Sequence, residues 1–271
     1  MTAFRTSIRI AALAGAFLAF STSAAAQESD GSGWTVSLGA GAQVLPKYPG
    51  ADEVGIAPLI VGGLRRQGSP LTIEAPDDGW GFGLLPQGSA FNVGPAIRLQ
   101  AKRDEDDVGA PVGNVPFTVE AGGFVQVLLA DSVRLRAEGR RAVNGHDGWT
   151  GDLSADFVAR DGERTLFTIG PRARYGDGRY HEAYFGVSPT VAAASGLPAY
   201  DPNGGFYALG ATAGVTHMFS RSWGLYAYAS YDRLIGDAAD SPIVQTYGSR
   251  NQYSAGLALI YSFNIGSLFG R

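Results

Sequence analysis

The sequence predicts an all-β fold, an antiparallel transmembrane β-barrel of the outer-membrane type with about twelve strands. Three observations predict it. Apolar and polar residues alternate with period 2 in one segment after another, the polar side often carries arginine, and the connections are short at one end and longer at the other. Strands with lipid on one side and a wet lumen on the other would show this pattern, whereas a soluble sandwich packs apolar faces together.

The N-terminal segment is expected to be a targeting signal. Two arginines precede an uncharged apolar run at 10–20, and a run of small residues ends at Ala26. That order is typical of a secretory signal peptide, and the run is shorter than the roughly 20 residues that a spanning helix needs. A short anchor helix is the alternative. We therefore expect a signal peptide at 1–26, a barrel domain at 27–271, and export to the cell outer membrane.

Composition narrows the possible functions. The chain has 271 residues, no cysteine, a net charge of −4 and no basic run. Disulfides and thiolate metal sites are excluded, so the backbone ladder must hold an exported fold together. Nucleic acid is not expected as a partner, because its phosphates demand a basic surface.

Twelve strands are expected, and each is a stretch of alternation bounded by turn residues. In the first, Trp34, Val36 and Leu38 share one face, and in the last, Leu257 and Leu259 do. An even number of strands places both termini at the periplasmic end of the barrel. A single bent strand over 71–85 is the alternative, and it would make the number of strands odd. The strands are expected at 34–44, 54–65, 71–75, 80–85, 90–102, 116–128, 133–143, 149–160, 165–176, 205–219, 223–233 and 252–264.

Loop lengths and aromatic residues agree with a barrel in a bilayer. The connections at 66–70, 86–89, 129–132, 161–164 and 220–222 are short, as periplasmic turns are. Longer connections alternate with them, and two tight ones, at 76–79 and 144–148, carry hairpin signals. Aromatic residues lie near the expected strand ends, where interfacial girdles form.

Six stretches, in order along the chain, carry recognisable motifs: Tyr48–Glu53, Arg103–Asp107, Ala183–Ser188, Ser195–Tyr200, Gly236–Val244 and Gly248–Gln252. Together they resemble the MipA/OmpV family of outer-membrane proteins, the MltA-interacting proteins. The resemblance implies an outer-membrane barrel without established catalytic residues or cofactors. It also implies a scaffold that interacts with the lytic murein transglycosylase MltA and a bifunctional murein synthase, and contact with outer-membrane lipid and lipopolysaccharide. Other members are described as adhesins or as proteins of osmotic or antibiotic responses. One departure is that residues 264–271 follow Phe263, where such barrels usually end on an aromatic residue.

The expected lumen face combines charges of both signs. Two interpretations stay open: a ladder of ion pairs that closes the lumen, or the lining of a narrow, selective channel. Unpaired buried charges would be very costly, so pairing is expected in either case. The inward-pointing candidates are Arg98, Arg134, Arg136, Arg140, Arg172, Arg174, Glu120 and Glu138, with Asp152 and Asp156 on nearby strands.

The outer connections hold the other candidates. The loop at 180–202 is unusually apolar, with Tyr184, Phe185, Leu197 and Tyr200, and is expected to plug the barrel mouth partly or to bind a partner or ligand. The acidic run at 104–107 lacks the spacing of a Ca²⁺ loop and is expected to be solvated.

The chain is not expected to be an enzyme. His146 and His181 are expected at the surface in outer loops and His217 at a strand end, and no nucleophile elbow, zinc motif or phosphate loop occurs. The expected function is a non-enzymatic scaffold for murein-remodelling enzymes. A narrow small-solute channel or receptor with an arginine-lined lumen is the alternative, and an outer-loop adhesin is a weaker third.

Overall fold

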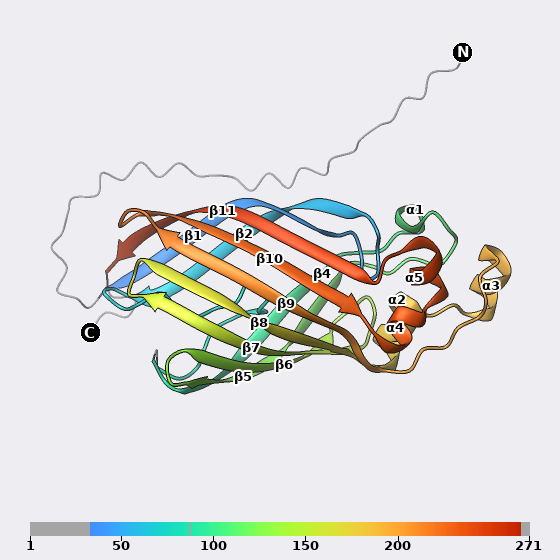
Figure 1. Cartoon of the computed structure of the whole chain (residues 1–271), viewed down its shortest axis with the longest axis horizontal. Helices are drawn as coiled ribbons and strands as arrows, with labels where there is room; N and C mark the ends of the chain where they lie inside the picture. Colours follow the sequence, from blue (N-terminus) through green and yellow to red (C-terminus); the bar gives the residue numbers. More distant parts are fainter. Residues whose placement is uncertain (1–32, 87, 267–271) are drawn as a thin grey trace, which may run out of the picture.

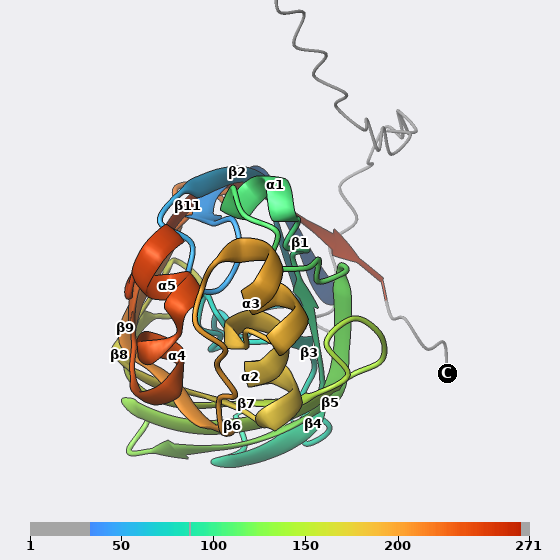
Figure 2. The ribbon, with the colours of Figure 1, turned by 90° about the vertical axis from the view of Figure 1, so that its right-hand side faces the viewer.

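Eleven antiparallel strands form a single sheet that curls around a lumen (Figure 1 and Figure 2). The structure is a computed structural model that describes residues 33–86 and 88–266, so the expected signal peptide at 1–26 lies outside the described residues. The sheet order is β2-β1-β11-β10-β9-β8-β7-β6-β5-β4-β3. The predicted antiparallel barrel fold is confirmed. The strands are β1 (Trp34–Pro46), β2 (Val54–Arg66), β3 (Trp80–Gly81), β4 (Phe91–Gln100), β5 (Thr118–Leu129), β6 (Val133–Ala142), β7 (Trp149–Asp161), β8 (Thr165–Gly176), β9 (Gly205–Met218), β10 (Trp223–Leu234) and β11 (Asn251–Ile265).

The alternation along the strands separates an apolar outer wall from a polar interior. On β6, Val133 and Leu135 are exposed, whereas Arg134 and Arg136 are buried. Large apolar side chains such as Leu38, and Ile56 and Ile60 of β2, are likewise exposed on the outside. A wall of this kind is stable only where lipid covers it, which is the situation of a transmembrane barrel strand. Within the described residues, every helix is too short or too polar to cross a membrane.

The two ends of the barrel differ. Tight turns join β5 to β6, β7 to β8 and β9 to β10 at one end, which we call the turn end. The connections at the other end carry short helices, visible together at the right of Figure 1. We call these helices and their flanking loops the helical cap. The helices are α1 (Glu105–Val108), α2 (Gly178–Phe185), α3 (Pro189–Ser195), α4 (Gly236–Asp240) and α5 (Pro242–Tyr247).

Local sequence signals start and stop the cap helices. The Asp177 side chain accepts a hydrogen bond from the backbone N–H of Tyr180 and so caps α2. Ser188 caps α3 in the same way, Pro189 occupies its first turn, and Gly196 ends it in the left-handed conformation at φ +75°. The loop at 180–202 therefore folds as two helices.

One predicted strand is absent from the wall. Residues 71–75 form no strand, so that prediction was wrong, and the strand expected at 80–85 shrinks to β3. The segment Ser69–Gly79, which we call the strap, runs through the lumen instead. Near the turn end, the Leu71 N–H donates to the Gly162 carbonyl at 3.0 Å, and the Leu71 side chain packs with Val158 and Leu166. Because the chain leaves the wall after β2, no β pairing in the described part of the chain joins β2 to β3.

Candidate functional site: the lumen and the helical cap

The buried charges of the lumen begin with β6, where four alternate residues point inward. Arg134, Arg136, Glu138 and Arg140 are all buried. The antiparallel register places Arg134 opposite Asp156 on β7, and it places Asp152 of β7 opposite Arg174 on β8. Directly opposed residues on one face of a sheet lie close enough to pair. The strand pairing itself therefore brings opposite charges together across the lumen wall.

The first group of ion pairs centres on Asp156. Its Oδ2 accepts from the Nη2 of Arg134 at 2.8 Å, and its Oδ1 lies 2.8 Å from the Nη2 of Arg172 on β8. All three side chains are at most 1% exposed. Each of the two guanidinium groups offsets part of the hydration that the buried carboxylate loses.

The second group lies nearer the helical cap and centres on Arg140. Its guanidinium contacts Glu120 at 3.0 Å and also pairs with Glu138 and Asp152. Asp152 additionally contacts Arg98 at 3.0 Å and Arg174 at 2.9 Å. The network thus links four strands, β4 to β7, and continues to β8.

The strap supplies two further carboxylates to this network. Asp77 lies 2.8 Å from Arg172 and 3.0 Å from Arg174, and Asp78 contacts Arg134 at 2.5 Å. The N–H of Gly79 donates to Glu138 at 3.0 Å. These contacts hold the strap across the middle of the lumen.

The structure places all eight lumen candidates in this one network, together with Asp152 and Asp156. Sequence reasoning missed Asp77, Asp78 and Asp232, which lies 2.9 Å from Arg174. Pro76-Asp77-Asp78-Gly79 resembles a hairpin turn, and that resemblance concealed the role of its aspartates. A signal was present, because the six inward arginines faced only four assigned carboxylates.

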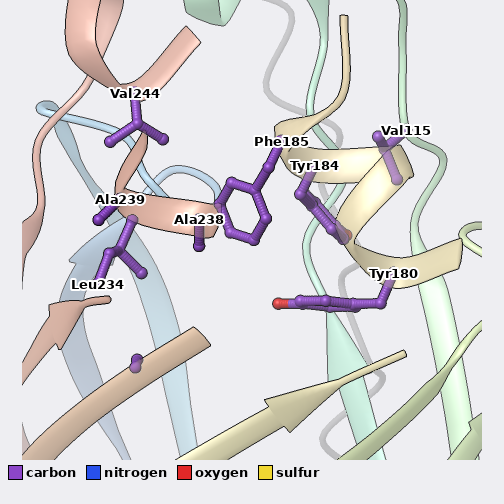
Figure 3. Close-up of a cluster of buried hydrophobic side chains, with 9 residues drawn as sticks. Val115, Tyr180, Tyr184, Phe185, Leu234, Ala238, Ala239 and Val244 are labelled. Atoms are coloured by element: carbon purple, nitrogen blue, oxygen red, sulfur yellow. The ribbon is translucent and has the colours of Figure 1, made fainter. Parts of the chain in front are cut away.

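The four loop candidates lie in the helical cap. Tyr184 and Phe185 on α2 are fully buried, and Figure 3 shows the Phe185 ring directed toward Ala238 of α4. Leu197 packs in a neighbouring cluster, and the Tyr200 hydroxyl donates to the Asp237 carbonyl at 2.9 Å. The apolar loop residues therefore form a small core that covers the barrel mouth.

Buried polar groups tie this core together. Arg103, which is 2% exposed, donates to the carbonyls of Tyr184 at 2.8 Å and Val112 at 3.2 Å. Burial lowers the pKa of its guanidinium and raises that of the Tyr184 hydroxyl. Asp104 precedes α1 and pairs with Lys102, and Asp107 lies 3.6 Å from Lys47.

Two histidines that were expected at the surface are buried. His146 is buried with its Nε2 3.0 Å from Glu120, and His181 is buried at the start of α2. Burial lowers the pKa of His181. The expectation was wrong because outer loops that fold into a cap have an interior of their own. His217 lies at the end of β9, 3.0 Å from the Thr165 hydroxyl.

A family model described as MltA-interacting protein MipA matches residues 38–263, which is most of the chain. The chain belongs to the MipA family. The resemblance seen in the sequence is thereby confirmed, and this MipA-family chain, with its lipid-exposed apolar wall, is an outer-membrane β-barrel protein. No curated protein matches the sequence.

Solved structures with some likeness to this MipA-family barrel are distant. An outer membrane channel from Pseudomonas putida F1 is 9% identical, with 85% of this chain and 96% of that chain covered and a TM-score of 0.43. Neisserial surface protein A is 8% identical, with 86% and 97% covered and a TM-score of 0.24. A Pseudomonas aeruginosa FadL homologue is 9% identical, with 87% and 90% covered and a TM-score of 0.31.

Proposed function

We propose that this protein is a non-enzymatic outer-membrane scaffold that binds a murein-remodelling enzyme of the MltA type at its turn end. The observation that carries the proposal is the occupied lumen. The strap and the ion-pair network lie across the lumen, in the path that an open pore would need, while the described turn-end loops remain exposed. The family description adds the kind of partner. In this proposal residues 1–26 are a cleaved signal peptide and the turn end faces the periplasm.

The turn end offers a small charged surface for such a partner. Asp131, Arg164 and Arg221 lie in three different turns, and all are exposed. Rim charges of this kind steer association and set its salt dependence. We expect them to contribute to binding although each turn is short.

The test is a binding measurement between the mature protein in detergent and a purified lytic transglycosylase of the MltA type. The wild type should bind at ordinary salt, and the double variant Arg164→Glu with Arg221→Glu should bind at least tenfold more weakly. Arg179→Glu, an exposed arginine at the cap end, is the matched control and should change nothing. Absence of wild-type binding at ordinary salt would contradict the scaffold proposal.

A second candidate function is a channel that opens when the strap leaves the lumen. The strap is a single extended segment, held near the middle of the barrel by Asp77 and Asp78. Without it, the lumen would carry an excess of arginine. Planar-bilayer recording should then show a closed wild type and an anion-selective conductance for Asp77→Asn with Asp78→Asn. If the double variant folds and stays silent, the channel hypothesis is refuted.

A further inference from the structure

The helical cap contains a cavity that the scaffold proposal does not use. It lies among α2, α3 and the connection between β6 and β7, and its volume is about 870 Å³. That volume falls within the roughly 300–1,000 Å³ typical of small-molecule sites. Its residues come from several segments that are far apart in the sequence, including Val112, His146, Arg179, Val187 and Tyr200.

Apolar and polar surface line the cavity in similar amounts, and the apolar part includes buried side chains. Val112 and Val187 are buried, and Val191 and Tyr200 are half-buried beside them. The Tyr200 hydroxyl already donates to a backbone carbonyl, so the residue presents mainly its ring. His146 is also engaged, since its Nδ1 accepts from the Gly148 N–H at 3.1 Å and its Nε2 lies 3.0 Å from Glu120. A ligand would therefore meet apolar walls in the interior.

The charged residues that line the cavity behave differently from those of the lumen. Asp147, Glu182, Asp201 and Arg179 are exposed. Within the described residues, none of these four side chains has a hydrogen-bond or ion-pair partner, whereas each lumen arginine named above has at least one carboxylate partner. Three carboxylates against one guanidinium leave an excess of negative charge around an apolar interior.

We propose that this cavity is a binding site for an organic cation, a molecule with an amine or guanidinium group attached to an apolar body. The apolar body would lie against Val187, Val191 and Tyr200, and the cationic group would lie among the carboxylates of Asp147, Glu182 and Asp201. Burial of the apolar body supplies affinity, and the carboxylates select the sign of the charge. An anion of the same shape would be rejected by the same carboxylates.

Three probes of matched shape test the proposal: 4-phenylbutylamine, 4-phenylbutanol and 4-phenylbutyrate. Binding to the full mature chain in detergent is measured by calorimetry at low salt. The amine should bind at least tenfold more tightly than the carboxylate, with the alcohol between them. The triple variant Asp147→Asn, Glu182→Gln, Asp201→Asn should weaken amine binding about tenfold and leave the alcohol unchanged. Asp52→Asn with Asp106→Asn, two exposed carboxylates outside the cavity, is the matched control.

A second variant tests the cavity independently of charge. Val191→Trp places a large ring in the cavity and should abolish binding of both the amine and the alcohol, while the barrel keeps its heat-modifiable migration on gels. Equal binding of the three probes, no detectable amine binding, or unchanged amine binding by either variant would overturn the proposal. Because these readouts do not involve a transglycosylase, they do not depend on the scaffold proposal.

Discussion

The substitution Asp156→Asn tests whether the lumen network stabilises the barrel. It removes the carboxylate that contacts Arg134 and Arg172, both at 2.8 Å and both almost fully buried. Breaking a buried ion pair on one side costs about 3–5 kcal/mol, because the remaining charge is left without its partner. Here each arginine keeps one strap carboxylate, so we expect the lower end, about 3 kcal/mol. That cost corresponds to about a hundredfold change in the unfolding equilibrium.

The assay is urea unfolding of the protein in detergent micelles, followed by tryptophan fluorescence. Glu163→Gln is the matched control, because it removes a carboxylate that pairs with Arg65 at 2.6 Å but is 51% exposed. Such a surface pair contributes about 0–1 kcal/mol. If Asp156→Asn destabilises the protein no more than Glu163→Gln does, the network carries no net stability and our reasoning about it fails.

Three further predictions concern the turns and the cap. Ala130 has φ +49° in the β5–β6 turn, so Ala130→Asn should raise the unfolding free energy by about 1 kcal/mol; an unchanged urea midpoint would contradict this. Phe185→Ala should cost about 3–5 kcal/mol within the cap and speed amide exchange in α2 but not in β6; equal changes in both would argue against a separate cap core. Burial lowers the pKa of His181 in the folded cap. As the pH drops below about 6.5, the ordinary pKa of histidine, the unfolded state therefore binds more protons than the folded state, and the stability of the cap should fall. His181→Gln should remove that fall, as measured by amide exchange between pH 7.5 and 5.

The strands of the wall were predictable because their side chains alternate between two very different environments, the lipid outside the barrel and the polar lumen inside it. All the observed strands except β3, ten in number, have boundaries within two residues of those expected, and β11 runs beyond Phe263 to Ile265. The cap helices were not predictable in the same way. They span four to eight residues, too short to display a 3.6-residue period. Their burial depends on contacts between connections far apart in sequence, such as Arg103 with Tyr184.

The strap shows the limit of alternation most clearly. Leu71, Ile73 and Ala75 alternate with Thr72 and Glu74, as in a wall strand. The pattern indicates an extended backbone with two different sides, and the strap has both properties. The alternation does not indicate whether the apolar side of the segment meets lipid or the interior of the barrel. In this protein, Leu71 and Ile73 pack inside the barrel.

The balance of charges in the lumen indicates what the alternation cannot, namely that the strap lies inside the barrel. The wall strands supply six inward arginines and, with Asp232 of β10, five carboxylates, so about one positive charge would be buried without compensation, which is very costly. The remaining compensation must come from acidic residues outside the wall strands. Asp77 and Asp78 are adjacent and follow the one doubtful strand, so they are the acidic pair that the chain can bring inside by leaving the wall after β2. The break between β2 and β3 and the strap inside the lumen thus have one cause, which is that the turn expected to join two wall strands carries counter-charges of the interior.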